Sequence, residues 1–281
     1  MHRAPPRANH SRDGRDVIDV LMGREAKTAS GFDQIHAPVL QCFTALCDQL
    51  GGEASALLRA ADIGAPKIPA AGPAVTYRQM CGLFALAARR LGCADFGMCL
   101  AQRQADTDVL GPLGQAIAVA PTFWAALDSL SRFSYAHSLA LSMRLRRSHM
   151  EGAVAQCFDV LLDPSPDIGQ AIEHVVLMAR LTAGKLSGGW IRPVRVDLRH
   201  QPIADPVTYR RHFGCDVRFS QQDNAIHYNV EDLSRPLVAA DISAFRQALK
   251  LIAARFPSRM PLKAQVRGII VHHLGSGPAT V

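Results

Sequence analysis

The chain of 281 residues is 48% hydrophobic and 20% charged, which is the composition of a globular protein with one large or two modest domains. It lacks an apolar run of the ~18 residues that a membrane-spanning helix needs. No apolar segment follows the N-terminal arginines, so we also expect no secretory signal. The 7 cysteines are scattered, without a CxxC pair or a His/Cys group at zinc-ligand spacing. We therefore expect buried free thiols in a cytoplasmic protein, and no metal site.

The net charge of +7 is concentrated near the two ends of the chain. Residues 1–15 carry +3 and residues 241–281 carry +5, which leaves −1 for everything between them. A near-neutral body with basic ends predicts that any contact with a polyanion involves the ends. The alternative is that these basic side chains are simply solvated.

Helical patterns dominate the first half of the chain. Residues 1–33 are rich in Arg, Pro, Asp and Gly without hydrophobic periodicity, so we expect a disordered basic segment there. Helices are then predicted from Pro38 to the Gly51-Gly52 stop, over 54–61, and from a Thr76 N-cap to Gly92. Two more follow, in "GPLGQAIAVA" and "PTFWAALDSLSRFSYAH".

At Leu139 the hydrophobic period changes from that of a helix to that of a strand. "LALSMRLR" alternates apolar and polar residues, and "AVAQCFDVLL" returns after the turn "SHMEG". A long buried helix begins near Ser165-Pro166, and "PVRVDLRH" is the next strand. A short helix in "DPVTYRRHFG" leads to "CDVRF" and "AIHYNV", which we expect to pair as a hairpin. The sequence thus predicts an α+β fold with an all-helical front section (about 38–137), a small sheet with helices (about 139–235) and two C-terminal helices.

Five apolar residues of the C-terminal part repeat at spacings of 3 and 4: Ile242, Phe245, Leu249, Ile252 and Phe256. This seam covers about two heptads, fewer than a firm coiled coil shows. It predicts either a dimerisation helix within a linker at 239–257 or a helix that packs on its own domain. Beyond Pro257 a second helix is expected, ending at Gly275.

We find no motif for catalysis or for a cofactor. "GPLGQA" lacks the third glycine of a dinucleotide fingerprint, "DFG" at 95–97 lacks every other kinase element, and GxSxG, HExxH and GxxxxGK[ST] do not occur. Glu173-His174 and His272-His273 have no ligand-spaced partners, so we expect these residues to be structural or exposed. We predict that the protein is not an enzyme and needs no cofactor.

One region mixes aromatic rings with polar groups, as small-molecule pockets do. Its residues are our candidate ligand-binding set: Trp124, Phe133, Tyr135, His137 and Arg144. An ordinary helix–sheet interface has the same make-up. Arg144 and Arg195 would suit an anion, but each falls on the polar side of an alternating strand, where exposed arginine is normal.

Three stretches resemble the AraC/XylS family of bacterial transcription regulators, in the subgroup with an arabinose-binding-like N-terminal domain. They are "GPLGQAIAVAPTFWAALDSLSRF", "PVRVDLRHQPIADPVTYRRHFGCDVRFSQQDNAIHYNVEDLSRPL" and "VRGIIVHHLGSGPATV", and the match spans about residues 35–281. The second stretch is the most specific, because its length and its glycine and proline positions all agree with the family pattern.

The resemblance implies a cytoplasmic, dimeric, effector-responsive regulator. Its domain at 34–238 would sense a small molecule, and a C-terminal domain with two helix-turn-helix units would bind DNA. Residues 258–281 match only the first helix of that second domain, with Lys263 and Arg267 as candidate contacts to the DNA backbone. A helix-turn-helix reads bases with its second helix, so we expect this chain alone not to bind an operator specifically.

Two other functions stay open at this point. The chain could be a stand-alone small-molecule sensor, or an interaction module that pairs with related regulators through the seam at 242–256. The more remote alternative is an enzyme that uses the aromatic region as its pocket.

Overall fold

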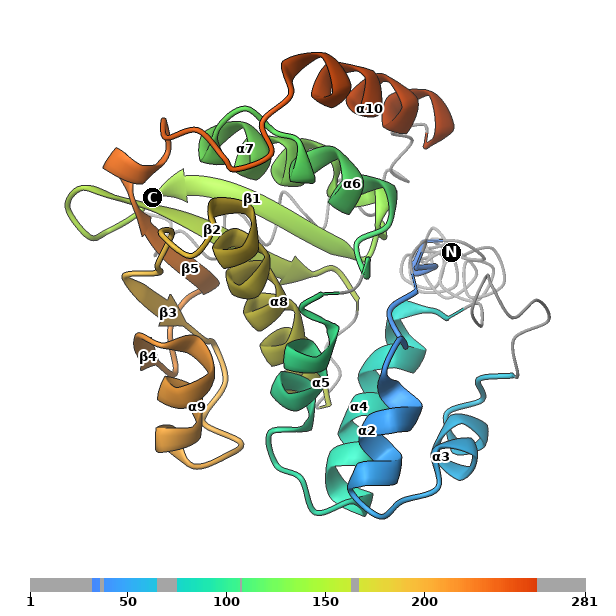
Figure 1. The fold of residues 1–281 in the computed structure, drawn as a ribbon. Coiled ribbons are helices and arrows are strands. Elements are labelled where there is room, and N and C mark those ends of the chain that lie inside the picture. Colours follow the sequence, from blue (N-terminus) through green and yellow to red (C-terminus); the bar gives the residue numbers. More distant parts are fainter. Residues whose placement is uncertain (1–31, 36–37, 65–74, 107, 163–166, 257–281) are drawn as a thin grey trace, which may run out of the picture. The chain divides into compact units, whose positions relative to one another are not determined.

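The computed structural model describes residues 32–35, 38–64, 75–106, 108–162 and 167–256 (Figure 1). The predicted disordered segment at 1–33 lies outside the described residues, except for its last two. The expected helix beyond Pro257 and the helix-turn-helix remnant at 258–281, with Lys263 and Arg267, also lie outside them. In the part of the chain that is described, no helix is long and apolar enough to cross a membrane.

The elements run from helices to a sheet, as the sequence predicted. The helical section holds α2 (Phe43–Gln49), α3 (Ala54–Ala60), α4 (Tyr77–Arg90), α5 (Phe96–Gln104), α6 (Pro112–Ala118), α7 (Phe123–Phe133) and the 3-10 turn η1 (Ser134–Ala136). The sheet section holds β1 (Leu141–Arg147), β2 (Ala153–Val160), α8 (Gly169–Ser187), β3 (Arg195–Asp197), α9 (Pro206–Phe213), β4 (Asp216–Arg218), β5 (Asn224–Asn229) and η2 (Val230–Asp232), and α10 (Ile242–Arg255) follows. The predicted α+β class is confirmed.

Helix α4 begins at the N-cap that the sequence indicated. Thr76 Oγ1 accepts a hydrogen bond from the Gln79 backbone N–H at 3.1 Å, and Gln79 Oε1 accepts one from the Thr76 N–H at 3.1 Å. This capping box satisfies two amides that the helix itself leaves without partners.

The sheet has the strand order β1-β2-β5-β3-β4. Strands β1, β2, β5 and β3 pair antiparallel in turn, whereas β4 pairs parallel to β3. The predicted hairpin of "CDVRF" with "AIHYNV" is therefore wrong, because β3 lies between those two strands. Helix α9 carries the chain from β3 back to a parallel neighbour, so the polar segment after β4 has to cross β3 before β5 begins.

The two faces of the sheet differ in composition. Helix α7 lies against one face, where the ring of Phe123 meets the ring of Tyr228 edge-on at 4.9 Å. Buried apolar residues of the same parity on the neighbouring strands include Phe158, Ile226 and Val196, and buried Gln156 and Asn224 are polar exceptions. The opposite face carries charged side chains at its alternate positions, and these form the site described below.

Helix α8 is the central helix of the domain and contacts α4, α5, α9, β2 and β5. It approaches α5 so closely that a Cβ on Gly97 would lie 2.1 Å from the backbone oxygen of Gln170. The Gln170 side chain accepts a hydrogen bond from the Gly97 N–H at 2.7 Å. Only glycine allows this approach of the two backbones.

Helix α10, which carries the predicted seam, packs on α6 of its own domain. Ile252 is 2% exposed, and Phe245, Leu249 and Phe256 are partly buried. Ile242 is 55% exposed at the start of the helix. Packing within the domain thus accounts for part of the seam, while dimerisation through it stays a prediction.

His174 of α8 is buried in the helical section. Its Nε2 lies 2.7 Å from Gln104 Oε1, and the Gln104 amide donates to the carbonyls of Val39 and Gln41 at 2.9 and 2.6 Å. Burial, with a smaller effect of His137, lowers the pKa of His174 to about 3. The expectation that this histidine is structural is consistent with its contacts.

We predict that His174 makes the fold sensitive to mild acid. An unfolded chain protonates this imidazole near pH 6.5, whereas the folded one does not, so the free energy of unfolding falls as the pH drops below 6.5. Between pH 7 and pH 5 this group alone should cost about 2 kcal/mol. Urea denaturation of the wild type and of His174→Gln at both values measures the difference between their pH slopes. Equal slopes would contradict the assignment.

Candidate functional site

The candidate site is the charged face of the sheet, which lies on the side opposite α7. The strand register places Arg144, Cys157, Ala225 and Asp197 in one row across β1, β2, β5 and β3, and Arg146, Ala155, His227 and Arg195 in the next. Ala155, Cys157 and Ala225 at its centre are small and 0% exposed. Long charged side chains surround this small-residue centre.

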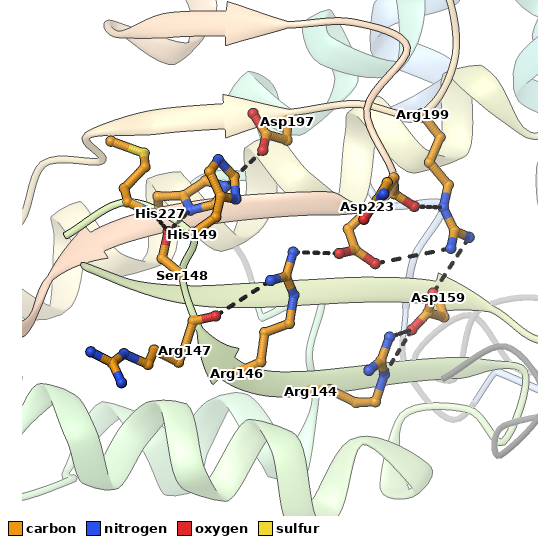
Figure 2. Close-up of polar contacts among 12 residues, drawn as sticks. Arg144, Arg146, Arg147, Ser148, His149, Asp159, Asp197, Arg199, Asp223 and His227 are labelled. Carbon is orange, nitrogen blue, oxygen red and sulfur yellow. Dashed lines mark hydrogen bonds and ion pairs between the residues drawn. The ribbon is translucent and has the colours of Figure 1, made fainter. Parts of the chain in front are cut away.

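At one end of the charged face, two carboxylates share three guanidinium groups (Figure 2). Asp159 Oδ2 accepts from Arg144 Nε at 2.9 Å and from its Nη2 at 2.5 Å, and Arg199 Nη1 lies 3.5 Å from Asp159 Oδ1. Arg199 also reaches Asp223 Oδ1 at 4.0 Å, and Arg146 pairs with the same carboxylate. The carboxylates are nearly buried, at 4% and 10% exposure, whereas the three arginine side chains are 25–38% exposed.

At the other end of the charged face, the Asp197 carboxylate pairs with Arg195 and with His227. Arg195 Nε lies 2.8 Å from Asp197 Oδ1, and His227 Nε2 lies 2.9 Å from Asp197 Oδ2. Burial by itself would raise the pKa of Asp197, but the hydrogen bonds from His227 and Arg195 outweigh it and lower that pKa below its usual value. Arg195 also contacts exposed His149, whose pKa is lowered by partial burial and then by the arginine charge.

The charges of this face do not balance. Around the small-residue centre, four guanidinium groups, of Arg144, Arg146, Arg195 and Arg199, face three carboxylates, of Asp159, Asp197 and Asp223. The exposed Asp216–Arg218 pair continues the same rows onto β4 and adds no net charge. The site is therefore electrostatically suited to one further anionic group.

Ser148, His227 and Asp197 form a chain of hydrogen bonds with the residue types of a hydrolase triad. Ser148 Oγ lies 2.8 Å from His227 Nδ1, so the serine and the carboxylate face the opposite nitrogens from those they use in the serine proteases. Ser148 Oγ also accepts from the Met150 N–H at 3.0 Å, and His227 is 0% exposed. The arrangement ties the β1–β2 turn to β5 and β3.

The structure does not gather the five predicted ligand-binding residues in one place. Phe133 and Tyr135 lie together, with ring centroids 6.0 Å apart, and His137 is buried beside His174. Trp124 is 47% exposed on α7. Arg144 alone belongs to the charged face, on the other side of the sheet from α7.

The expectation that Arg144 and Arg195 are ordinary exposed arginines is wrong. Their side chains are 25% and 16% exposed, because each is paired with a buried aspartate. Sequence reasoning missed the three aspartates of the site. The signal was the alternation of charged and apolar residues along β1 and β3, but which strands are neighbours could not be deduced without the strand order.

Comparisons with known proteins identify the class of protein that has this fold. The structure of the transcriptional regulator CdpR from Pseudomonas aeruginosa aligns with a TM-score of 0.52 at 18% identity, covering 78% of this chain and 69% of that one. At that identity the likeness concerns the fold. The family model for the arabinose-binding N-terminal domain of AraC transcription regulators matches residues 51–237.

The chain therefore belongs to the AraC family of transcription regulators, and the domain described above is its N-terminal regulatory domain. Among curated proteins, the chain is similar to the HTH-type transcriptional regulator VirS of Mycobacterium tuberculosis, in strains CDC 1551 / Oshkosh and ATCC 25618 / H37Rv. The identity is 28% over 247 residues, which is 86% of this chain and 72% of the relative. Both this relative and the family are regulators of transcription rather than enzymes.

We predict that the ion pairs of the charged face stabilise the domain. Asp159→Asn leaves two partly buried guanidinium groups facing a neutral amide, and it should lower the free energy of unfolding by about 1–3 kcal/mol. Asp216→Asn is the matched control, because Asp216 pairs with Arg218 where both side chains are more than half exposed. Its cost should stay below about 0.5 kcal/mol. Equal losses in urea denaturation would contradict the prediction.

Proposed function

We propose that the regulatory domain senses a small organic anion, and that the anion binds on the charged face. The observation that carries this proposal is the excess of four guanidinium groups over three carboxylates around a centre of small residues. A carboxylate ligand would act as the fourth acid and accept charge-assisted hydrogen bonds from the partly exposed arginines. The proposed setting is the cytoplasm, where a transcription regulator meets metabolites.

The name of the family refers to arabinose, which is a neutral sugar. Sugars are held by hydrogen bonds and need no surplus charge, whereas an anion is attracted by the net positive charge around the centre of this face. The charge balance therefore favours an acid over a polyol as the effector of this chain.

The expected result is an increase in melting temperature with small carboxylic acids, but not with their amides or with arabinose. Ligand at one hundred times its dissociation constant stabilises by about 2.7 kcal/mol, which a thermal-shift screen of amino acids, organic acids and fatty acids detects. Arg146→Met should abolish the ligand-induced shift, measured from the variant's own baseline. Arg132→Gln, which changes a 67% exposed side chain on α7, should preserve it. A shift with arabinose alone would overturn the proposal.

We further propose that the regulator forms a homodimer through α10. With Ile252 used in packing on α6, the exposed part of the seam is its N-terminal end, at Ile242. Leu251 is 64% exposed and lies on the other side of the helix from the seam, so it offers a matched control.

Sedimentation velocity tests the dimer. Ile242→Asp should convert a dimer into a monomer without unfolding the domain, since an acidic residue is favourable in the first turn of a helix. Leu251→Asp should leave the dimer intact. A dimer that persists in Ile242→Asp would exclude this end of the seam as the interface.

A further inference from the structure

A second group of polar side chains lies between α5 and α9, away from the charged face. Cys93 and Asp95 come from the turn before α5, and Cys99 from α5 itself. The two thiols lie 3.5 Å from different oxygens of the Asp95 carboxylate, and the three ligand atoms lie within 4.8 Å of one another. His212, at the end of α9 and 4% exposed, places Nε2 2.9 Å from Asp95 Oδ2.

The contacts of His212 include Cys99 as well as Asp95. A hydrogen bond with Cys99 has the largest effect on the pKa of His212 and raises it, and the bond with Asp95 acts in the same direction against burial. The imidazole therefore meets both a thiol and the carboxylate. Both cysteines are free and partly buried.

Asp95 occupies the N-cap position of α5 but does not cap the helix. An N-cap aspartate normally accepts from the backbone N–H two or three residues on, yet Asp95 makes no such bond. The Gly97 N–H that it would take donates to Gln170 Oε1 of α8 instead. Because another side chain serves the helix end, the Asp95 carboxylate is free to turn toward the thiols and the imidazole.

The donor set is one that tetrahedral zinc sites use. Zinc takes thiolate sulfur at about 2.3 Å and carboxylate oxygen or imidazole nitrogen at about 2.0–2.2 Å, which places a sulfur about 3.5 Å from an oxygen across a tetrahedral angle. Here each thiol lies 3.5 Å from its own oxygen of Asp95, and His212 Nε2 lies 2.9 Å from one of those oxygens, so the four donors stand in one cluster. Two thiolates with one imidazole and one carboxylate select a thiophilic ion over magnesium or calcium.

We infer that Cys93, Asp95, Cys99 and His212 bind a zinc ion that links the start of α5 to the end of α9. The sequence had predicted no metal site, because the two cysteines are 6 positions apart and the histidine is 117 residues from Asp95. These ligands come together only when the chain folds, so no local spacing in the sequence predicts the metal site. A zinc ion here would join the helical section to the sheet section, and its binding free energy would add to the stability of the domain.

The test uses the full chain, freed of metal with a chelator under reducing conditions. Titration with zinc should show one equivalent bound per chain and a rise in melting temperature. Cobalt(II) should give the charge-transfer band of thiolate ligation and the intense visible bands of a tetrahedral site. Cys99→Ser and His212→Gln should each weaken zinc binding at least tenfold, and Cys215→Ser, which changes a partly buried cysteine outside the cluster, should not.

Two results would overturn the inference. One is a reduced wild-type chain that binds no zinc; if Cys93 and Cys99 of that chain then form a disulfide in air, the pair serves redox chemistry instead. The other is zinc binding that is equal in the wild type and Cys99→Ser. Circular dichroism of each variant shows whether it is folded, and Cys93→Ser gives a second variant if Cys99→Ser is not.

Discussion

The fold depends on the burial of α8, a helix whose polar residues each reach a different part of the domain. Gln170 bonds to the start of α5, and His174 bonds to Gln104 at its end. On the other side, Glu173 is 0% exposed and accepts from the Tyr209 hydroxyl at 2.5 Å, with His200 Nε2 at 3.0 Å. A buried carboxylate is tolerated only with such partners. These contacts fix both the helical section and the β3–α9 connection against one helix.

The sheet contacts α8 through β2 and β5 and has two unlike faces. The face toward α7 is mostly apolar, so it contributes to the core, and this leaves the alternate positions of the same strands available for charge. Because the strand period is two, the register that buries Phe158 and Ile226 also aligns the arginines and aspartates of the charged face. Its central alanines and cysteine are small, which brings the charged groups of neighbouring strands within reach of each other across them. The site is thus a by-product of the register that the core requires.

Much of this architecture can be predicted from the sequence, and the exceptions have physical reasons. The Thr76 cap, the long buried helix α8 and the alternation of β1 are local patterns with one interpretation each. The predicted pairing of β4 with β5 was wrong because strand pairing depends on where α9 returns the chain. Hydrophobic periodicity does not encode that position. The charged face and the Cys93–His212 cluster were missed for the same reason, since their members are neighbours only in space. The candidate ligand-binding residues from Trp124 to His137 illustrate the opposite case. They are close in sequence, but their side chains point in different directions in the fold.

The segment that leads into α10 is fastened to the helical layer at several points. The backbone N–H of Trp124 donates to the Leu233 carbonyl at 2.8 Å, that of Leu237 to Pro121 at 3.3 Å, and that of Asp241 to Val119 at 3.0 Å. The segment between η2 and α10 is therefore attached to the loop between α6 and α7 and to the start of α7. Helix α10 has 14 residues and so extends about 21 Å, so a tilt of only ~10° at that attachment would displace its far end by about 4 Å. Small movements beside the sheet thus displace the far end of α10 as the swing of a rigid rod.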